Sequence, residues 1–147
     1  MGGQGLFGTV ADVLRLLQVW SGDGNGTHGR VLTAETVRRA RSDPGIPMRP
    51  LESAIPALTH RAEFFPGIPT SWATTFLRVE ADVPGRRRAG SVSWAGLGNV
   101  HYWIDPASGI AGVWATQLLP FFDRAANEAF ESFERAVYRV LTDEYRT

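Results

Sequence analysis

Three apolar segments separated by short turns constrain the fold of this chain most strongly. Residues Gly90–Trp94, Asn99–Asp105 and Ile110–Gln117 have the β-branched and aromatic content that is typical of strands. The short turns between them predict an antiparallel meander. The last segment is apolar almost throughout, so we expect it to be a central strand that is covered on both faces. A fourth strand is predicted over Trp72–Glu80, which is rich in β-branched and aromatic residues.

Helices are expected before and after these strands. The first covers Val10–Trp20, with Thr9 as its cap and Asp12 as the capping-box partner. The second covers Ala34–Arg41 and is capped by Thr33.

A closing helix is predicted from its cap, Asp123, to about Thr142. Its pattern separates an apolar side from a charged side. The apolar side is expected to hold Phe130, Phe133, Val137 and Leu141, and the charged side Glu128, Glu131, Glu134, Arg135 and Arg139.

Helices, a meander and a closing helix together predict an α+β fold with an antiparallel sheet and flanking helices. We expect one domain over residues 1–147, with a helical and irregular part at 1–69 and the strands and closing helix at 70–147. The segment Asp43–Gly67 carries five prolines without a clear period, so we expect it to be irregular.

The composition excludes several kinds of chemistry. The chain has no cysteine, and its fifteen basic residues are all arginine. Without lysine there is no Walker A loop, no Schiff base and no Ser-x-x-Lys pair. The formal net charge is zero, so it does not suggest a nucleic-acid partner. No run of apolar residues is long enough for a membrane span, and no signal peptide is visible, which predicts a cytoplasmic protein.

The candidate cofactor and metal motifs lack the neighbouring residues or elements that such sites require. The glycines Gly3, Gly5 and Gly8 match a dinucleotide fingerprint, but no strand precedes them. Asp23 opens a segment like a calcium loop that lacks the required glycine and glutamate, and Asn25-Gly26 is more simply a turn. The three histidines show no metal-ligand spacing. We therefore expect neither a cofactor nor a metal.

Three further candidates also favour a plain structural interpretation. Ser93 lacks both glycines of a nucleophile elbow and leads into a strand instead of a helix, so it is a poor nucleophile. His101 on a strand beside Trp103 is more often packed than catalytic. The run Arg86–Arg88 is typical of a solvated turn.

Several segments, in this order, resemble the C-terminal part of the class C β-lactamase and penicillin-binding superfamily, especially its esterase branch. They are Gly2–Asp12, Leu32–Val37, Gly90–Gly96, Asn99–Pro106 and Gly109–Val113. The resemblance implies a β-lactamase/transpeptidase-like fold of which this chain forms the C-terminal portion.

The resemblance also implies a site. Relatives place their third catalytic motif on a sheet strand, often as Lys-Thr-Gly, and in esterases as Trp-Gly-Gly or His-Ser-Gly. Trp94-Ala95-Gly96 occupies that place, with alanine instead of the usual middle glycine. By resemblance, Trp94 would form a wall of the acyl pocket, and the Leu97 N–H would be one donor of an oxyanion hole. The nucleophile and base motifs of the family do not occur in these residues.

The resemblance implies a serine hydrolase, a carboxylesterase acting through an acyl-enzyme on a small ester or amide substrate. These residues alone are expected to be inactive, and to self-associate or to require an N-terminal complementing segment. The alternative is a non-catalytic remnant or partner-binding module of the same fold. A third hypothesis, a free-standing ligand-binding α+β domain, has no site to support it.

Overall fold

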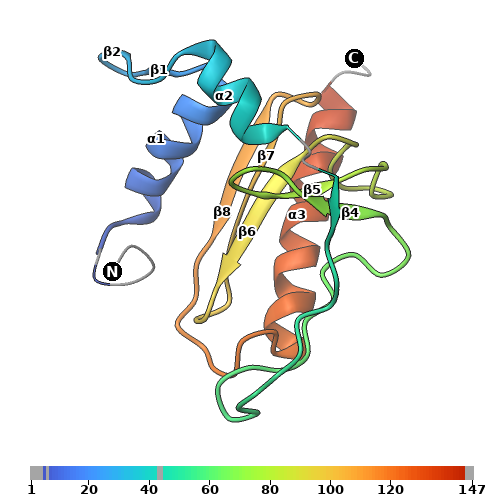
Figure 1. Ribbon diagram of the computed structural model, residues 1–147. Coiled ribbons are helices and arrows are strands. Elements are labelled where there is room, and N and C mark those ends of the chain that lie inside the picture. The colour runs from blue at the N-terminus through green and yellow to red at the C-terminus, as the bar shows by residue number, and fades with distance from the viewer. Residues whose placement is uncertain (1–4, 6, 43–44, 145–147) are drawn as a thin grey trace.

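Strands that follow one another in the sequence lie side by side, so the main sheet keeps the order of the chain. A computed structural model describes residues 5, 7–42 and 45–144. Six antiparallel strands pair in the order β3-β4-β5-β6-β7-β8 (Figure 1). The elements are α1 (Val10–Ser21), β1 (Asn25–Gly26), β2 (Gly29–Arg30), α2 (Ala34–Arg41), β3 (Ile46–Pro47), β4 (Thr70–Trp72), β5 (Leu77–Val79), β6 (Val92–Gly96), β7 (Val100–Asp105), β8 (Ile110–Trp114) and α3 (Arg124–Glu144). The predicted α+β class with flanking helices is confirmed.

Helix α1 covers part of one face of the sheet. Its capping box is confirmed, because the Thr9 hydroxyl accepts from the Asp12 N–H at 3.2 Å and the Asp12 carboxylate accepts from the Thr9 N–H at 3.1 Å. Leu17 of α1 packs in a buried cluster with Val92 and Ile104 of the sheet. Burial of these apolar side chains holds α1 on β7 and β8.

Helix α3 covers the other face. As predicted, Asp123 caps it, and its carboxylate accepts from the Ala126 N–H at 2.9 Å. Phe130 and Tyr138 of α3 pack in a buried cluster with Trp103 and Ile110. Within the described part of the chain, no helix is long and apolar enough to cross a membrane.

The expected single strand over Trp72–Glu80 is wrong, because a turn divides it into β4 and β5. The last carbonyls of α2 have no partner within the helix. Thr74 and Thr75 supply partners: their hydroxyls donate to the Arg39 and Ala40 carbonyls at 3.2 and 3.1 Å. The two threonines, which locally favour a strand, therefore end α2 instead.

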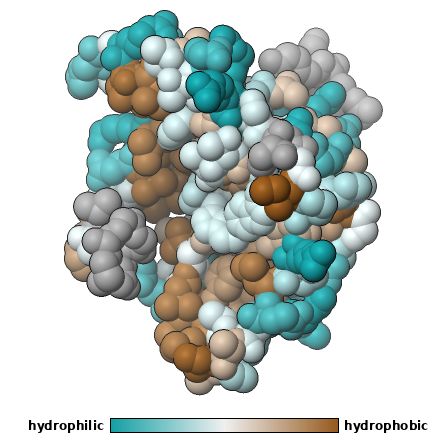
Figure 2. Space-filling view, viewed as in Figure 1, coloured by the Kyte–Doolittle hydropathy of each residue, from teal (hydrophilic) through white to brown (hydrophobic). Residues whose placement is uncertain are grey.

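The strand predicted over Ile110–Gln117 is also corrected. It ends at Trp114, after which the Thr116 hydroxyl donates to the Gly98 carbonyl at 2.6 Å. Among the described strands β8 is an edge, not the predicted centre. Figure 2 shows apolar side chains gathered between α1 and the sheet and at the lower end of the same face.

Two segments expected to be loops contain short strands. The hairpin β1–β2 turns at residues 27–28, so Asn25-Gly26 is not the turn but the first strand. The irregular segment contributes the edge strand β3, which pairs with β4. The remainder of that segment, as far as the structure describes it, is irregular, as predicted; its first two residues lie outside the described residues.

The arginine run is not the solvated turn that we predicted. Arg86 and Arg87 are buried, and their Nε–H groups both donate to the Glu134 carboxylate at 2.6 Å. Glu134 is fully buried, so its expected place on the charged side of the closing helix is also wrong. The Arg87 guanidinium lies 5.6 Å from the ring centroid of Trp103 and 5.1 Å from that of Phe65. This ion cluster joins the segment before β6 to α3.

Removing the Glu134 charge is expected to destabilise the fold strongly. Glu134→Gln leaves the buried Arg87 guanidinium without a counter-charge among the described residues, while Arg86 keeps only Glu131, at 3.2 Å. Breaking a buried ion pair in this way typically costs about 3–5 kcal/mol. Glu128→Gln is the matched control on the same helix, because Glu128 forms an exposed pair with Arg124, and such pairs contribute about 0–1 kcal/mol. Urea unfolding of the two variants gives the comparison, and equal losses would contradict the structural role of Glu134.

A second expected effect concerns Gly112 of β8, where an added Cβ would overlap the buried Trp103 ring. Gly112→Ala should lower the free energy of unfolding by about 1–3 kcal/mol, as overpacking does. Gly96→Ala is the control, because its Cβ would meet only the Val100 side chain, at 3.9 Å. That variant should stay within about 0.5 kcal/mol of the parent chain. Thermal melts of both variants give the comparison. A melting temperature of Gly112→Ala as close to that of the parent chain as the melting temperature of Gly96→Ala would contradict the packing argument.

Candidate functional site

The segment Trp94–Leu97 lies where β6 ends and turns into β7. Trp94, Ala95 and Gly96 are the last residues of β6 and pair with Tyr102, His101 and Val100 of β7. Burial decreases along the segment, from half-buried Trp94 and Ala95 to exposed Gly96 and Leu97. The structure therefore brings the four predicted residues together at one open end of the sheet (Figure 1).

Leu97 lies in the β6–β7 turn and not on a strand. Its N–H makes no backbone hydrogen bond within the described part of the chain. Asn99 holds the turn in place: its amide donates to the Leu118 and Pro120 carbonyls at 3.0 and 2.9 Å, and its oxygen accepts from the Phe122 N–H at 2.9 Å. The turn is thus fixed while one backbone donor stays available.

Asn99 is a positioning residue that the sequence argument missed. It is fully buried and has a φ of 55°, a left-handed conformation that asparagine tolerates better than most residues. An asparagine directly after Leu-Gly was an available signal for a tight turn. Its partners around Pro120 are far along the chain, so no local pattern could reveal them.

Aromatic rings surround Trp94. Its ring centroid lies 4.7 Å from that of Trp72 and 5.5 Å from that of Phe64. The Phe64 ring also lies 5.2 Å from that of Phe122, whose N–H donates to the Asn99 side chain. Trp94 is therefore packed in a cluster that joins β6 to the irregular segment, while remaining partly accessible.

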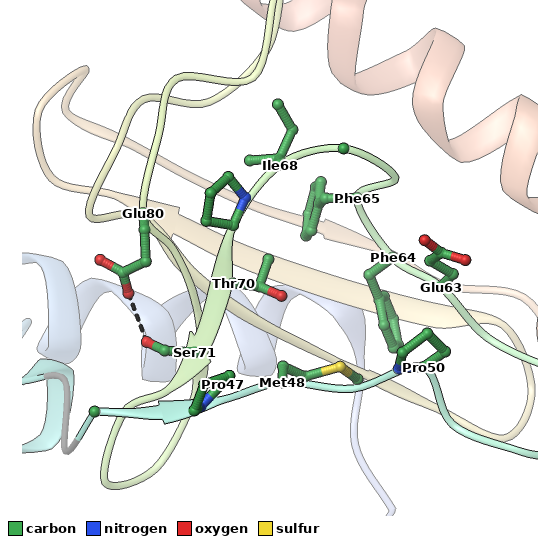
Figure 3. Close-up of a pocket in the computed structure, with 13 residues that line it drawn as sticks. Pro47, Met48, Pro50, Glu63, Phe64, Phe65, Ile68, Thr70, Ser71 and Glu80 are labelled. Atoms are coloured by element: carbon green, nitrogen blue, oxygen red, sulfur yellow. Dashed lines mark hydrogen bonds between the residues drawn. The ribbon is translucent and has the colours of Figure 1, made fainter.

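A cavity of about 530 Å³ lies beside this cluster, between β3, β4 and the segment that precedes β4 (Figure 3). Phe64, Met48 and Pro50 line one part of it, with the three side chains close together. Its two carboxylates already have partners: Glu63 pairs with Arg61 at 3.0 Å, and Glu80 accepts from the Ser71 hydroxyl at 2.5 Å. The cavity is thus mainly an apolar recess.

His101 is packed, in agreement with the prediction. Its ring is buried and stacks on Phe130 at 4.2 Å between centroids. Burial, with the nearby Arg87 charge as the next contribution, lowers the pKa of His101 to about 4. The imidazole is therefore neutral at pH 7, and its buried Nε2 has no hydrogen-bond partner in the described part of the chain.

The other histidines and Ser93 do not assemble a further site. Ser93 is buried on β6. No group of three or more His, Asp or Glu side chains among the described residues could hold a metal ion. The dinucleotide-like glycine pattern at the start of the chain lies partly outside the described residues.

The chain matches no family model and no curated protein. Solved structures do resemble it. An engineered simvastatin synthase, LovD from Aspergillus terreus, is 22% identical and superposes with a TM-score of 0.75 over 97% of this chain. The unliganded LovD structure is 21% identical, with a TM-score of 0.73 over 93% of this chain.

The chain spans about a third of these proteins, 36% and 35% of their lengths. At this identity the likeness concerns the fold. Together with the six-stranded antiparallel sheet and its flanking helices, it shows that these residues have the fold of the C-terminal portion of a β-lactamase-like protein.

Proposed function

We propose that this chain is the C-terminal portion of a serine hydrolase, a carboxylesterase that acts through an acyl-enzyme on small esters or amides. The observation that supports it best is the open end of β6. There a fixed turn leaves the Leu97 N–H without a backbone acceptor among the described residues. In acyl transfer such a donor stabilises the oxyanion of the tetrahedral intermediate.

The surroundings of Leu97 support the same function. Gly96 is exposed, and an added Cβ would meet no backbone atom of the described residues within 4 Å. Glycine is therefore not required by the packing of this chain, which is consistent with close approach of a substrate. Trp94 and its aromatic neighbours provide a rigid apolar wall for an acyl group.

The nucleophile and the base would come from an N-terminal portion. These residues hold no lysine, so they cannot contain a Ser-x-x-Lys motif. Two structural features favour docking of a further segment. The β8 strand has an unpaired edge among the described strands, and next to it Phe133 of α3 is 38% exposed while its ring lies 5.4 Å from Trp114.

Complementation tests this proposal. The 147 residues alone should not turn over p-nitrophenyl acetate or butyrate, because a serine needs an adjacent base to attack at neutral pH. Co-expression with the N-terminal portion of a simvastatin synthase, which under this proposal would supply the nucleophile and the base, should give saturable turnover. Gly96→Ala should then lower kcat/KM by about 10²–10³, the loss expected when an oxyanion donor is blocked, at an unchanged melting temperature.

Turnover by the chain alone that disappears on mutating one serine would contradict the proposal. A complex that forms without turnover would favour the alternative, a non-catalytic module of the same fold.

The acyl-pocket role of Trp94 has its own test in the complemented protein. Trp94→Ala should shift the preference among acetate, butyrate and longer esters, because it removes a wall of the pocket. Trp72→Ala is the matched control, since Trp72 belongs to the same aromatic cluster but is the last residue of β4, two strands away from β6. A parallel loss for all esters in both variants would show that Trp94 is only part of the core.

A further inference from the structure

A second cavity lies at the other end of the sheet from Gly96, where the β7–β8 turn meets α3. It measures about 550 Å³, within the range of small-molecule sites. Four arginines line it, namely Arg86, Arg88, Arg135 and Arg139, and no carboxylate does among the described residues. This concentration of guanidinium groups occurs in a chain whose formal net charge is zero.

Two of these arginines already have partners. Arg86 is buried against Glu134, and it also lies 3.2 Å from Glu131. Arg135 pairs with Glu131 at 3.0 Å. Arg88 and Arg139 are exposed, and neither guanidinium forms an ion pair with a described side chain.

The charges do not cancel around the cavity. Arg87 adds a fifth guanidinium behind the lining, against three carboxylates, those of Asp105, Glu131 and Glu134. Arg88 and Arg139 are the two lining arginines that form no ion pair with a described carboxylate. A ligand with two negative charges would complete the balance.

The buried Asp105 gives the cavity a fixed shape. Its carboxylate is fully buried and accepts from the Arg88 N–H at 2.9 Å, the Ser108 N–H at 3.1 Å and the Tyr138 hydroxyl at 2.9 Å. These three donors belong to three separate segments that line the cavity, so the Asp105 carboxylate fixes these segments relative to one another. Because it binds the Arg88 backbone, Asp105 leaves the Arg88 side chain available for a ligand.

We propose that this cavity binds a small organic phosphate, as a phosphomonoester dianion, independently of the hydrolase function proposed above. Arg88 and Arg139 would hold the phosphate oxygens, since guanidinium groups bind phosphate through paired N–H donors. A phosphomonoester carries about −1.5 to −2 charge at pH 7, which matches the two uncompensated arginines. Ile110, Leu141 and the Tyr138 ring would contact the organic part.

Isothermal titration with phenyl phosphate tests this site on the full 147-residue chain. We expect saturable binding with a dissociation constant below about 1 mM, weakened by added salt. Arg88→Gln and Arg139→Gln should each weaken binding by about tenfold or more, because each removes a charge-assisted contact. Arg124→Gln is the matched control, since Arg124 is an exposed arginine at the opposite end of α3; it should change the affinity by less than about twofold.

Other ligands distinguish the chemistry of the site. Benzyl alcohol should not bind, phthalate should bind more weakly than phenyl phosphate, and inorganic phosphate should also bind more weakly because it lacks an organic part. Equal affinity for inorganic and phenyl phosphate would overturn the assignment of an organic ligand, and tighter binding of phthalate would overturn that of a phosphate.

The variants and the parent chain give independent evidence. Thermal melts establish that each exposed-arginine variant is folded, and the salt dependence of the parent chain needs no variant. Absence of saturable binding to the parent chain, or equal weakening by Arg124→Gln, would refute the site.

Discussion

The buried Glu134 carboxylate is the contact on which the packing between the sheet and its closing helix depends. It binds Arg86 and Arg87, and the Arg87 guanidinium then lies beside the Trp103 ring. Trp103 in turn fills the space over Gly112, where β8 has no side chain. One ion cluster thus links the segment before β6, the centre of β7, the edge strand β8 and helix α3.

The same cluster shapes the electrostatics of the interior. Burial together with the Arg87 charge lowers the pKa of His101 to about 4. The neutral imidazole can then stack on Phe130 without introducing another charge. Beyond the cluster, the Asp105 carboxylate accepts a hydrogen bond from the Tyr138 hydroxyl, which connects the last turns of α3 to the end of β7. Charged groups therefore make contacts inside this small core beside those of its apolar side chains.

Local patterns predicted the helices and the meander well, because helix caps and the alternation of apolar and polar residues depend only on residues that are close in the sequence. They failed where distant contacts decide the outcome. Thr74 and Thr75 favour a strand locally but bind the end of α2, and Glu134 has the spacing of an exposed residue but meets two arginines nearly fifty positions earlier. The continuous apolar run from Ile110 predicted a central strand, whereas it forms an edge among the described strands.

The candidate site followed from the resemblance of Trp94-Ala95-Gly96 to a catalytic motif, and its position at an open sheet end agrees with a substrate-facing role. The hydrogen bonds that fix the turn beside this site could not be predicted, because the Asn99 amide donates to carbonyls about twenty residues later in the sequence. The cavity lined by Arg88 and Arg139 was equally hidden, since its residues come from three separate segments.

We propose that these residues are one portion of a larger fold, with a β8 edge that is unpaired among the described strands and with apolar side chains that a further segment covers. Light scattering after size exclusion measures the mass of the chain with and without such a segment. We expect the 147 residues alone to elute as dimers or larger species, and as a one-to-one complex once an N-terminal portion of the fold is added. A sharp monomer peak with a cooperative thermal melt, unchanged by that addition, would contradict it.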